Sequence, residues 1–340
     1  MRSGHLCPYA ADAAAAGLSE AHTDVPPWLK KRGTGGRMPG KQADMHEKEA
    51  KSILTTQNGM NHYRGCETGC IYCDAGLSGG RMTHDFSDVE IKPNAPELLE
   101  SALRRKRSKC MITTGAAGEP YPAAEAEREL TRRCLEVIDR YGFGLSVQTK
   151  SDLILRDLPL LESINRKSRC IVQIQLTAAD PELSGKLEPG AASPARRAEV
   201  LYAMRDAGIP TVVCVTPILP FINDTMENAS AIMEYCVRAE IYGLQTTGSG
   251  FVLKKGGRPA FEKMLDERFP GMKERYRETF QDEEEFISPN AGKVLSYMRT
   301  TCESFHIEND PARLFTWLHA FRDRQAGEQL NLFDFFGSSL

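Results

Sequence analysis

Six short apolar runs recur along the chain, separated by segments with helical periodicity. Each run is continuous rather than alternating, as is typical of strands buried on both faces. The runs occupy residues 61–65, 110–114, 143–149, 170–176, 211–216 and 241–246. Strands that alternate with helices in this way predict a parallel sheet with right-handed crossovers. We therefore expect an α/β protein, built on either an open doubly wound sheet or a barrel.

The helical segments carry recognisable start signals. Ser193 followed by Pro194 predicts an N-cap and a first helical residue. Asp224, with Glu227 three residues later, resembles a capping box in which Asp takes the usual Ser or Thr place. A further helix is expected over residues 123–140, before a glycine-containing turn.

Composition divides the chain into four parts. Residues 1–45 are rich in Ala, Gly, Pro and charge and lack periodicity, so we expect a disordered leader. Residues 46–250 hold the strand–helix alternation, residues 251–325 have a helical pattern, and residues 326–340 form a tail. No Gly-x-Gly-x-x-Gly follows the first strand, so nothing favours a dinucleotide-binding fold.

Charge and hydropathy limit the class of protein. The net charge of −3 argues against a globally basic nucleic-acid binder, although basic runs occur at residues 104–109 and 254–258. No apolar run reaches the roughly 20 residues of a membrane-spanning helix. The N-terminus lacks the basic start and long apolar core of a signal peptide. We therefore expect a cytoplasmic protein without a membrane partner, whose reduced thiols serve metals or catalysis.

Three of the ten cysteines, Cys66, Cys70 and Cys73, lie within eight residues as C-x3-C-x2-C. A structural zinc site normally uses four protein ligands, and the nearest histidines lie outside the usual spacings. Three thiolates on a short loop suit an iron–sulfur cluster better, because thiolates hold the irons of a [4Fe–4S] cube. Three ligands leave one iron open, and an open metal position is where a substrate or cofactor binds.

The segment CETGCIYC resembles the cluster motif of the radical S-adenosylmethionine (SAM) superfamily. NHYRGCETGCIYCDA, TTGAAGEPYPAAE, GFGLSVQTKSDLILRD, LEPGAASPARRAEVL and TPILPFINDT are similar to a subgroup related to spore photoproduct lyase, called photolyase-like, over residues 51–313. The resemblance implies a partial (β/α)6 TIM-type barrel with parallel strands, a C-terminal helical extension, and a site at the carboxyl ends of the strands. It also implies a [4Fe–4S] cluster on the three cysteines and SAM on the open iron.

The resemblance assigns several residues to the SAM site. Tyr72, before the third cysteine, is expected beside the adenosyl group. Lys150 matches a position that contacts the SAM carboxylate, which a cation suits. Gln175 and Arg197 are further candidates, each with packing or surface exposure as the alternative.

Three more residues are expected near the cofactor. Gly115 permits close approach of the backbone after the second strand. Glu119 is expected to line the same pocket, with an exposed loop position as the alternative. Ile218, after the fifth strand, is expected to flank the adenine, although the preceding proline also has a purely structural explanation.

The sequence departs from spore photoproduct lyase at two positions. That enzyme uses a cysteine after the second strand and a tyrosine after the third cluster cysteine to return hydrogen to the product. By spacing, those positions are Ala116 and Asp74 here, and neither side chain can donate hydrogen in that way. Tyr121 and Cys214 are the candidate substitutes, with an inert buried cysteine as the alternative for Cys214.

Partners are suggested by the tail and by the expected chemistry. The peptide QLNLF, from Gln329 to Phe333, resembles the short motif with which bacterial repair proteins dock on the sliding clamp. The alternative is an apolar tail that packs on the domain. Cluster reduction implies a reductant such as flavodoxin or ferredoxin.

Three functions remain open at this point. The first is a radical SAM enzyme, lyase-like or transferase, that abstracts hydrogen from a DNA or RNA substrate or a nucleotide lesion, as in DNA repair. The second keeps this chemistry but modifies a protein, peptide or small metabolite. The third is a non-catalytic metal-binding adaptor of the replication clamp.

Overall fold

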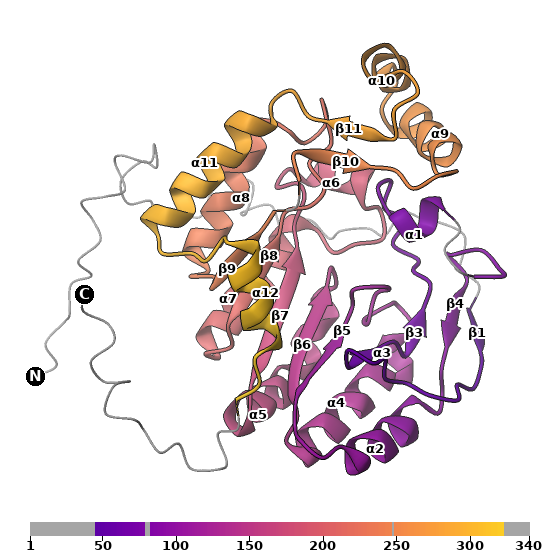
Figure 1. Cartoon of the computed structure of the whole chain (residues 1–340), viewed down its shortest axis with the longest axis vertical. Helices are drawn as coiled ribbons and strands as arrows, with labels where there is room; N and C mark the ends of the chain where they lie inside the picture. The colour runs from indigo at the N-terminus through magenta and orange to yellow at the C-terminus, as the bar shows by residue number, and fades with distance from the viewer. Residues whose placement is uncertain (1–44, 79–81, 247, 323–340) are drawn as a thin grey trace, which may run out of the picture.

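Six parallel strands form the central sheet of the computed structural model, which describes residues 45–78, 82–246 and 248–322 (Figure 1). Their spatial order follows the sequence order. The strands are β2 (Gly59–Met60), β5 (Met111–Thr114), β6 (Gly144–Thr149), β7 (Cys170–Gln175), β8 (Thr211–Cys214) and β9 (Gly243–Gln245). The outer strands β2 and β9 do not pair with each other, so the barrel is partial. The predicted α/β barrel with parallel strands is confirmed.

Helices cover the outer face of this sheet (Figure 1). They are α2 (Ala95–Arg105), α4 (Leu130–Tyr141), α5 (Leu158–Lys167), α7 (Pro194–Asp206), α8 (Met226–Arg238) and α11 (Ala291–Ser304). Their apolar residues and those of the strands form the largest buried cluster. Shorter segments connect them: α3 (Glu125–Arg128), η2 (Asp152–Asp157) and α6 (Pro181–Leu187).

The opposite, inner face of the sheet is closed at one end by α12 (Pro311–His319). Leu314 and Leu318 of this helix pack in one cluster with Met111, Ile171 and Val212, which lie at or next to the first residues of their strands. The helix therefore covers the amino-terminal ends of the strands, and leaves their carboxyl ends for the site described below.

The predicted position of the first strand was wrong. Only Gly59 and Met60 pair with β5, whereas β3 (Tyr63–Arg64) joins a separate sheet with β4 (Val89–Ile91) and β1 (Met45–Glu47). The chain leaves the barrel because two buried polar side chains fix it elsewhere. Tyr63 donates to Glu125 Oε2 at 2.6 Å, and His62 Nε2 lies 2.7 Å from Thr131 Oγ1.

One helix-start prediction is confirmed and another is wrong. Ser193 Oγ accepts from Arg196 N at 3.3 Å and caps α7 as expected. The N-cap of α8, however, is Thr225, whose hydroxyl accepts from Asn228 N at 3.2 Å. Asp224 instead accepts a 2.6 Å hydrogen bond from Ser288 and thereby ties the C-terminal region to α8.

The helix expected over residues 123–140 is divided in two. Glu129, with a φ of +47°, separates α3 from α4. The buried Glu125 carboxylate accepts from Thr131 N at 2.8 Å and from Arg132 N at 3.2 Å. An acidic side chain thus takes the N–H groups of the first turn of α4, where a helix favours negative charge.

The C-terminal region contains a small sheet as well as the expected helices. Strands β10 (Gly250–Val252) and β11 (Glu285–Ile287) pair antiparallel and flank α9 (Arg258–Arg268) and α10 (Met272–Phe280). Their aromatic side chains share a buried cluster with Ile71, Tyr72 and Leu77 of the cysteine loop and the short helix α1 (Asp74–Leu77). Within the described ranges, every helix is too short or too polar to cross a bilayer.

Candidate active site

The cysteine loop, residues 65–73, is attached to the barrel by backbone hydrogen bonds. Ile71 N donates to Leu187 O at 3.0 Å, and Cys66 N donates to Phe86 O at 2.8 Å. Gly65 has a φ of +92°, and a β-carbon there would lie 2.7 Å from Phe86 O. Only glycine therefore lets the loop approach the segment around residue 86 so closely.

All three predicted cluster cysteines line one pocket of about 540 Å³. Their three sulfur atoms do not all lie within 4.8 Å of one another. Thiolates around a single tetrahedral zinc would be about 3.8 Å apart, since Zn–S bonds measure roughly 2.3 Å. Three thiols and no fourth among the described residues that line this pocket suit a multi-iron cluster with one open position.

Two of the thiols also have defined partners. The Cys66 thiol donates to Thr68 Oγ1 at 3.1 Å, and Cys73 Sγ accepts from Gly76 N at 3.4 Å as the N-cap of α1. Burial raises the pKa of the Cys70 thiol, and the nearby Lys150 ammonium opposes this shift. The donor set therefore fits a cluster that holds its ligands as thiolates beside a cation.

Gly115 lines the pocket directly after β5. Its φ is +96°, and a β-carbon would lie 1.8 Å from Gln148 O on the neighbouring strand. The close backbone approach that the sequence indicated is thus an approach of Gly115 to Gln148 on β6. The glycine shapes the pocket wall through that contact.

Lys150 and Tyr72 lie together in the pocket. The Lys150 Nζ atom is 6.0 Å from the centre of the Tyr72 ring. Burial lowers the pKa of Lys150, but the charges of Cys70, Glu188 and Glu119 outweigh it, so its pKa is raised. The side chain therefore stays a cation at neutral pH and is suited to a carboxylate ligand.

Glu119 also lines the pocket, but its oxygens bind the protein itself. It accepts from Lys150 N and Tyr121 N, both at 3.0 Å, and from the Thr149 hydroxyl. Burial raises the pKa of this carboxyl. Glu119 thus holds the segment after β5 against the end of β6.

The buried Glu188, which nothing in the sequence singled out, organises the floor of the site. It accepts from the Tyr72 hydroxyl and, at 3.1 Å, from Thr177 Oγ1, and its Oε2 lies 2.7 Å from Arg197 Nη1. Gln175 Nε2 lies 3.4 Å from the Tyr72 hydroxyl and donates to Thr216 O at 2.7 Å. Tyr72 is therefore held from two sides.

Arg197 lies behind the pocket wall, in contrast to the position expected for a cofactor ligand. Its side chain is fully buried and is not among the pocket-lining residues. It donates to Gln175 O at 2.7 Å and to Ser184 Oγ at 2.8 Å, besides pairing with Glu188. Its two Nη atoms thus position Glu188, and through it Tyr72.

Three other predicted residues also lie outside the pocket lining. Tyr121 and Ile218 belong to the large buried cluster that the strands form with the outer helices. Cys214, the last residue of β8, belongs to the inner cluster, and its sulfur lies 3.6 Å from Gln245 Oε1. Burial raises the pKa of Cys214 to about 12, and the Lys150 charge opposes this shift.

The rim of the pocket joins the cysteine loop to the C-terminal region. Asp74, which follows the third cysteine, forms an ion pair with Lys254. Both residues line the pocket together with Met264 of α9. The sequence identified the basic run at 254–258 but gave no signal that it meets the cysteine loop.

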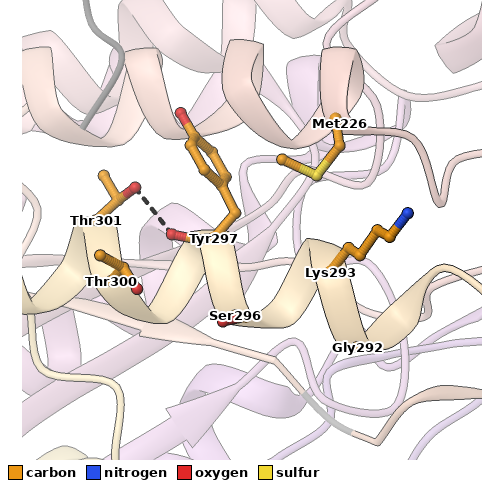
Figure 2. A pocket seen from close by; sticks show the side chains of 7 residues that line it. All are labelled: Met226, Gly292, Lys293, Ser296, Tyr297, Thr300 and Thr301. Carbon is orange, nitrogen blue, oxygen red and sulfur yellow. Dashed lines mark hydrogen bonds between the residues drawn. The ribbon is translucent and has the colours of Figure 1, made fainter. Parts of the chain in front are cut away.

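A second, shallower cleft lies between α8 and α11 (Figure 2). Met226 faces a side of α11 that carries Lys293, Ser296, Tyr297 and Thr300. The described residues that line it include no thiol and no carboxylate, so the cysteine pocket is the candidate active site.

Comparisons with known proteins agree with this geometry. Residues 60–236 match the Radical SAM superfamily. An uncharacterized protein of Mycobacterium bovis is 30% identical over 233 residues, which cover 65% of this chain and 66% of that protein. An uncharacterized protein of Methanocaldococcus jannaschii is 30% identical over 167 residues, 48% of this chain and 61% of that protein.

Solved structures show the same fold. Spore photoproduct lyase complexed with dinucleoside spore photoproduct has a TM-score of 0.55 at 12% identity, over 78% of this chain and 80% of that chain. A mutant of that enzyme with bound AdoMet and the dinucleoside has a TM-score of 0.51 at 13% identity, over 82% and 79% of the two chains. The family match covers about half of the chain and contains all three cysteines. The chain therefore belongs to the radical SAM superfamily of enzymes, which use a [4Fe–4S] cluster and SAM, and its fold is like that of spore photoproduct lyase.

Proposed function

We propose that this radical SAM enzyme abstracts a hydrogen atom from a phosphate-bearing substrate, a nucleic acid or a nucleotide lesion. The observation that carries the proposal is Lys254, which lines the same pocket as the three cysteines. Lys254, which pairs with Asp74, and its neighbour Lys255 are both exposed, so their ammonium groups are accessible to a phosphate group. Lys150 lies deeper, beside Tyr72, and is suited to the cofactor carboxylate.

The residues of this chain have separate tasks in the proposed reaction. Cys66, Cys70 and Cys73 would hold the cluster, which when bound would supply the electron for reductive cleavage of SAM and so the radical chemistry that takes hydrogen from the substrate. Lys150 binds the carboxylate of SAM, and Tyr72, held by Glu188 and Gln175, orients its adenosyl part. Gly115 and the small residues after it leave room for that part.

Of the two candidate hydrogen donors we propose Cys214, although its buried thiol lies behind the pocket lining in this structure. Its thiol stays protonated at neutral pH because burial raises its pKa to about 12. It lies on the inner face of the barrel, whereas Tyr121 packs on the outer face. In this step the S–H bond breaks and the C–H bond of the product forms. One electron from a reductant of the flavodoxin or ferredoxin class and one proton then restore the thiol.

The test is anaerobic reconstitution followed by reduction with dithionite in the presence of ultraviolet-irradiated and undamaged DNA or RNA. We expect irradiated nucleic acid to stimulate 5′-deoxyadenosine release, with deuterium transfer between substrate and cofactor. Lys254→Glu should weaken this stimulation and leave the slow release without substrate unchanged, whereas Lys293→Glu, in the second cleft, should change neither. If no nucleic acid stimulates release but a protein, peptide or metabolite does, the proposed substrate class is wrong.

Clamp docking by the tail is a separate proposal about a partner. The peptide from Gln329 to Phe333 lies outside the described residues. Its test is co-purification of the full chain with a bacterial sliding clamp, compared with a variant in which Gln329 and Phe333 are alanine. Equal recovery of the full chain and of the variant with the clamp would exclude this role. Zinc without iron in the purified chain would favour the adaptor function instead.

A further inference from the structure

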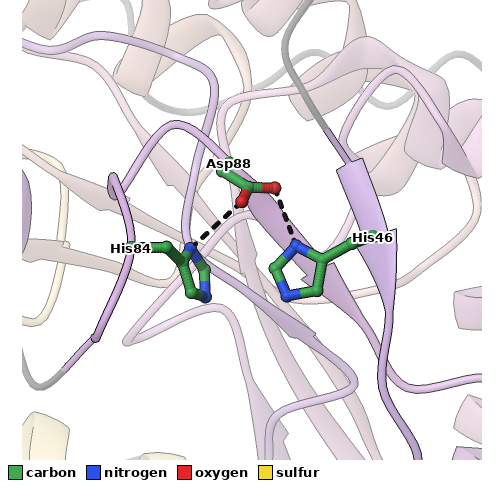
Figure 3. Close-up of side chains that lie close together, drawn as sticks. All are labelled: His46, His84 and Asp88. Atoms are coloured by element: carbon green, nitrogen blue, oxygen red, sulfur yellow. Dashed lines mark hydrogen bonds and ion pairs between the residues drawn. The ribbon is translucent and has the colours of Figure 1, made fainter.

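A second group of metal-ligating side chains lies outside the cysteine pocket. His46 is on β1, His84 lies in the segment before β4, and Asp88 immediately precedes that strand. Figure 3 shows both imidazole rings turned toward the Asp88 carboxylate. His46 Nδ1 is 2.8 Å from Asp88 Oδ1, and His84 Nδ1 is 3.4 Å from Asp88 Oδ2.

The spacing of these atoms is that of ligands around one small cation. One ligand atom from each residue lies within 4.8 Å of the other two. Zinc binds imidazole nitrogen and carboxylate oxygen at about 2.0–2.2 Å, so tetrahedral neighbours are roughly 3.3–3.6 Å apart. The two rings meet edge to face with centroids 4.6 Å apart.

The Glu90 carboxylate also lies near the His84 imidazole, on the side away from Asp88. Glu90 Oε2 lies 4.0 Å from His84 Nε2, the ring nitrogen that faces away from Asp88. Glu90 is buried and is itself held by Lys48 Nζ at 3.0 Å. When Nδ1 binds a metal, the proton resides on Nε2 and is donated to such a carboxylate, which fixes the ring and increases its basicity.

We propose that His46, His84 and Asp88 form a binding site for a divalent transition metal, with zinc as the fitting ion. Two imidazole nitrogens and one carboxylate favour zinc over magnesium or calcium, which prefer oxygen ligands. In this structure His84 Nδ1 lies 3.1 Å from Asp85 O, an acceptor, so metal binding through Nδ1 would break this contact and move the ring proton to Nε2, without a covalent or redox step. The fourth position is filled by water, since the His46 side chain is 39% exposed.

The site would stabilise one wall of the active-site pocket. Asp85, Phe86 and Ser87 lie between two of the ligands and line the pocket of the cysteines. A metal held by His84 and Asp88 fixes both ends of this short segment, and His46 attaches it to β1. With three protein ligands and water the site is of the open kind, and the ion would fix this segment outside the cysteine pocket, independently of the substrate proposed above.

The test is the metal stoichiometry of the chain after chelator treatment. We expect a variant with Cys66, Cys70 and Cys73 changed to serine to bind one zinc ion by isothermal titration calorimetry. Changing His46 or His84 to alanine, or Asp88→Asn, should abolish this binding, and Glu90→Gln should weaken it about 10-fold or more. His319→Ala, on the exposed face of α12, is the matched control and should bind normally.

A second measurement does not depend on the folding of the serine variant. Cobalt added to the wild-type chain with its cluster reconstituted should give a spectrum of nitrogen and oxygen ligands without a thiolate charge-transfer band. The band pattern should disappear in His84→Ala. Absence of stoichiometric zinc binding, or binding that survives the loss of both histidines, would overturn the proposal.

Discussion

Replacing Arg197 with methionine should destabilise the protein by leaving Glu188 buried without its main partner. The wild-type pair joins two side chains that are both fully buried, at 2.7 Å. Removing one member of a buried ion pair costs about 3–5 kcal/mol, because the remaining charge stays out of water. The lost hydrogen bonds to Gln175 O and Ser184 Oγ act in the same direction.

The pH dependence of this loss identifies Glu188 as its source. In the wild type, burial alone would raise the pKa of Glu188, but the charges of Arg197 and Lys150 and the Tyr72 hydroxyl lower it below 4.5. A carboxyl with a lowered folded-state pKa stabilises the protein above 4.5 and loses that contribution as the pH falls. Without Arg197, burial prevails and raises the folded-state pKa. The loss of unfolding free energy in Arg197→Met, relative to wild type, should therefore be largest at neutral pH and should become smaller toward pH 4.5.

Urea unfolding followed by circular dichroism, with and without reconstituted cluster, measures the effect. The double variant Arg197→Met with Glu188→Gln should recover at least about 2 kcal/mol relative to Arg197→Met, since no buried charge remains. A loss below about 1 kcal/mol, or a loss that is the same at pH 7 and pH 5 and is not relieved by Glu188→Gln, would refute this account.

Three further predictions concern the pocket. Gly115→Ala should cost more stability than Gly208→Ala in thermal unfolding. Both glycines have a positive φ, which costs alanine about 1–2 kcal/mol. Only at Gly115 would the new β-carbon also lie 1.8 Å from a carbonyl oxygen. Equal losses would show that the contact with Gln148 is unimportant. Lys150→Met should weaken SAM binding by about 10- to 100-fold in equilibrium binding, since a charge-assisted hydrogen bond contributes roughly 1.5–3 kcal/mol. Lys150→Arg should recover part of the lost affinity. Unchanged affinity of Lys150→Met would contradict the role of Lys150 at the SAM carboxylate. Cys70→Ala should lose iron while the chain still folds, whereas Cys110→Ala should keep wild-type iron; undiminished iron in Cys70→Ala would exclude it as a ligand.

The barrel could be predicted from the sequence because its strands are buried on both faces. Such strands are continuous apolar runs, and their ends agree with the prediction to within two residues from β5 to β9. The first strand could not be placed, because only two residues pair in it. Its neighbours Tyr63 and His62 are fixed by Glu125 and Thr131, more than 60 residues away in the chain.

The motif spacing and the family resemblance were enough to predict that the three cysteines, Lys150 and Gln175 share one pocket, while their roles toward the cofactor stay predictions. Glu188 could not be predicted, since a lone glutamate in a loop gives no signal until the fold brings it to Tyr72 and Arg197. Arg197 was a candidate cofactor residue through the family resemblance, with packing as the alternative, and its side chain is buried behind the pocket wall. Lys254 belongs to a separate region, and its meeting with Asp74 depends on the packing of aromatic residues that no local pattern encodes.

That aromatic cluster has a consequence for how the active site is made in the cell. The cysteine loop is among the first structured segments to be synthesised, but Phe251, Phe261 and Phe286, which pack in the same cluster, are translated well over 150 residues later. At about 5–20 residues per second, the ribosome takes roughly 10–40 s to reach them. During that interval the three thiols lack their apolar support. We therefore expect delivery of iron and sulfide to the native site to follow translation of the C-terminal region, and truncation of that region to yield a barrel that is synthesised but poorly loaded.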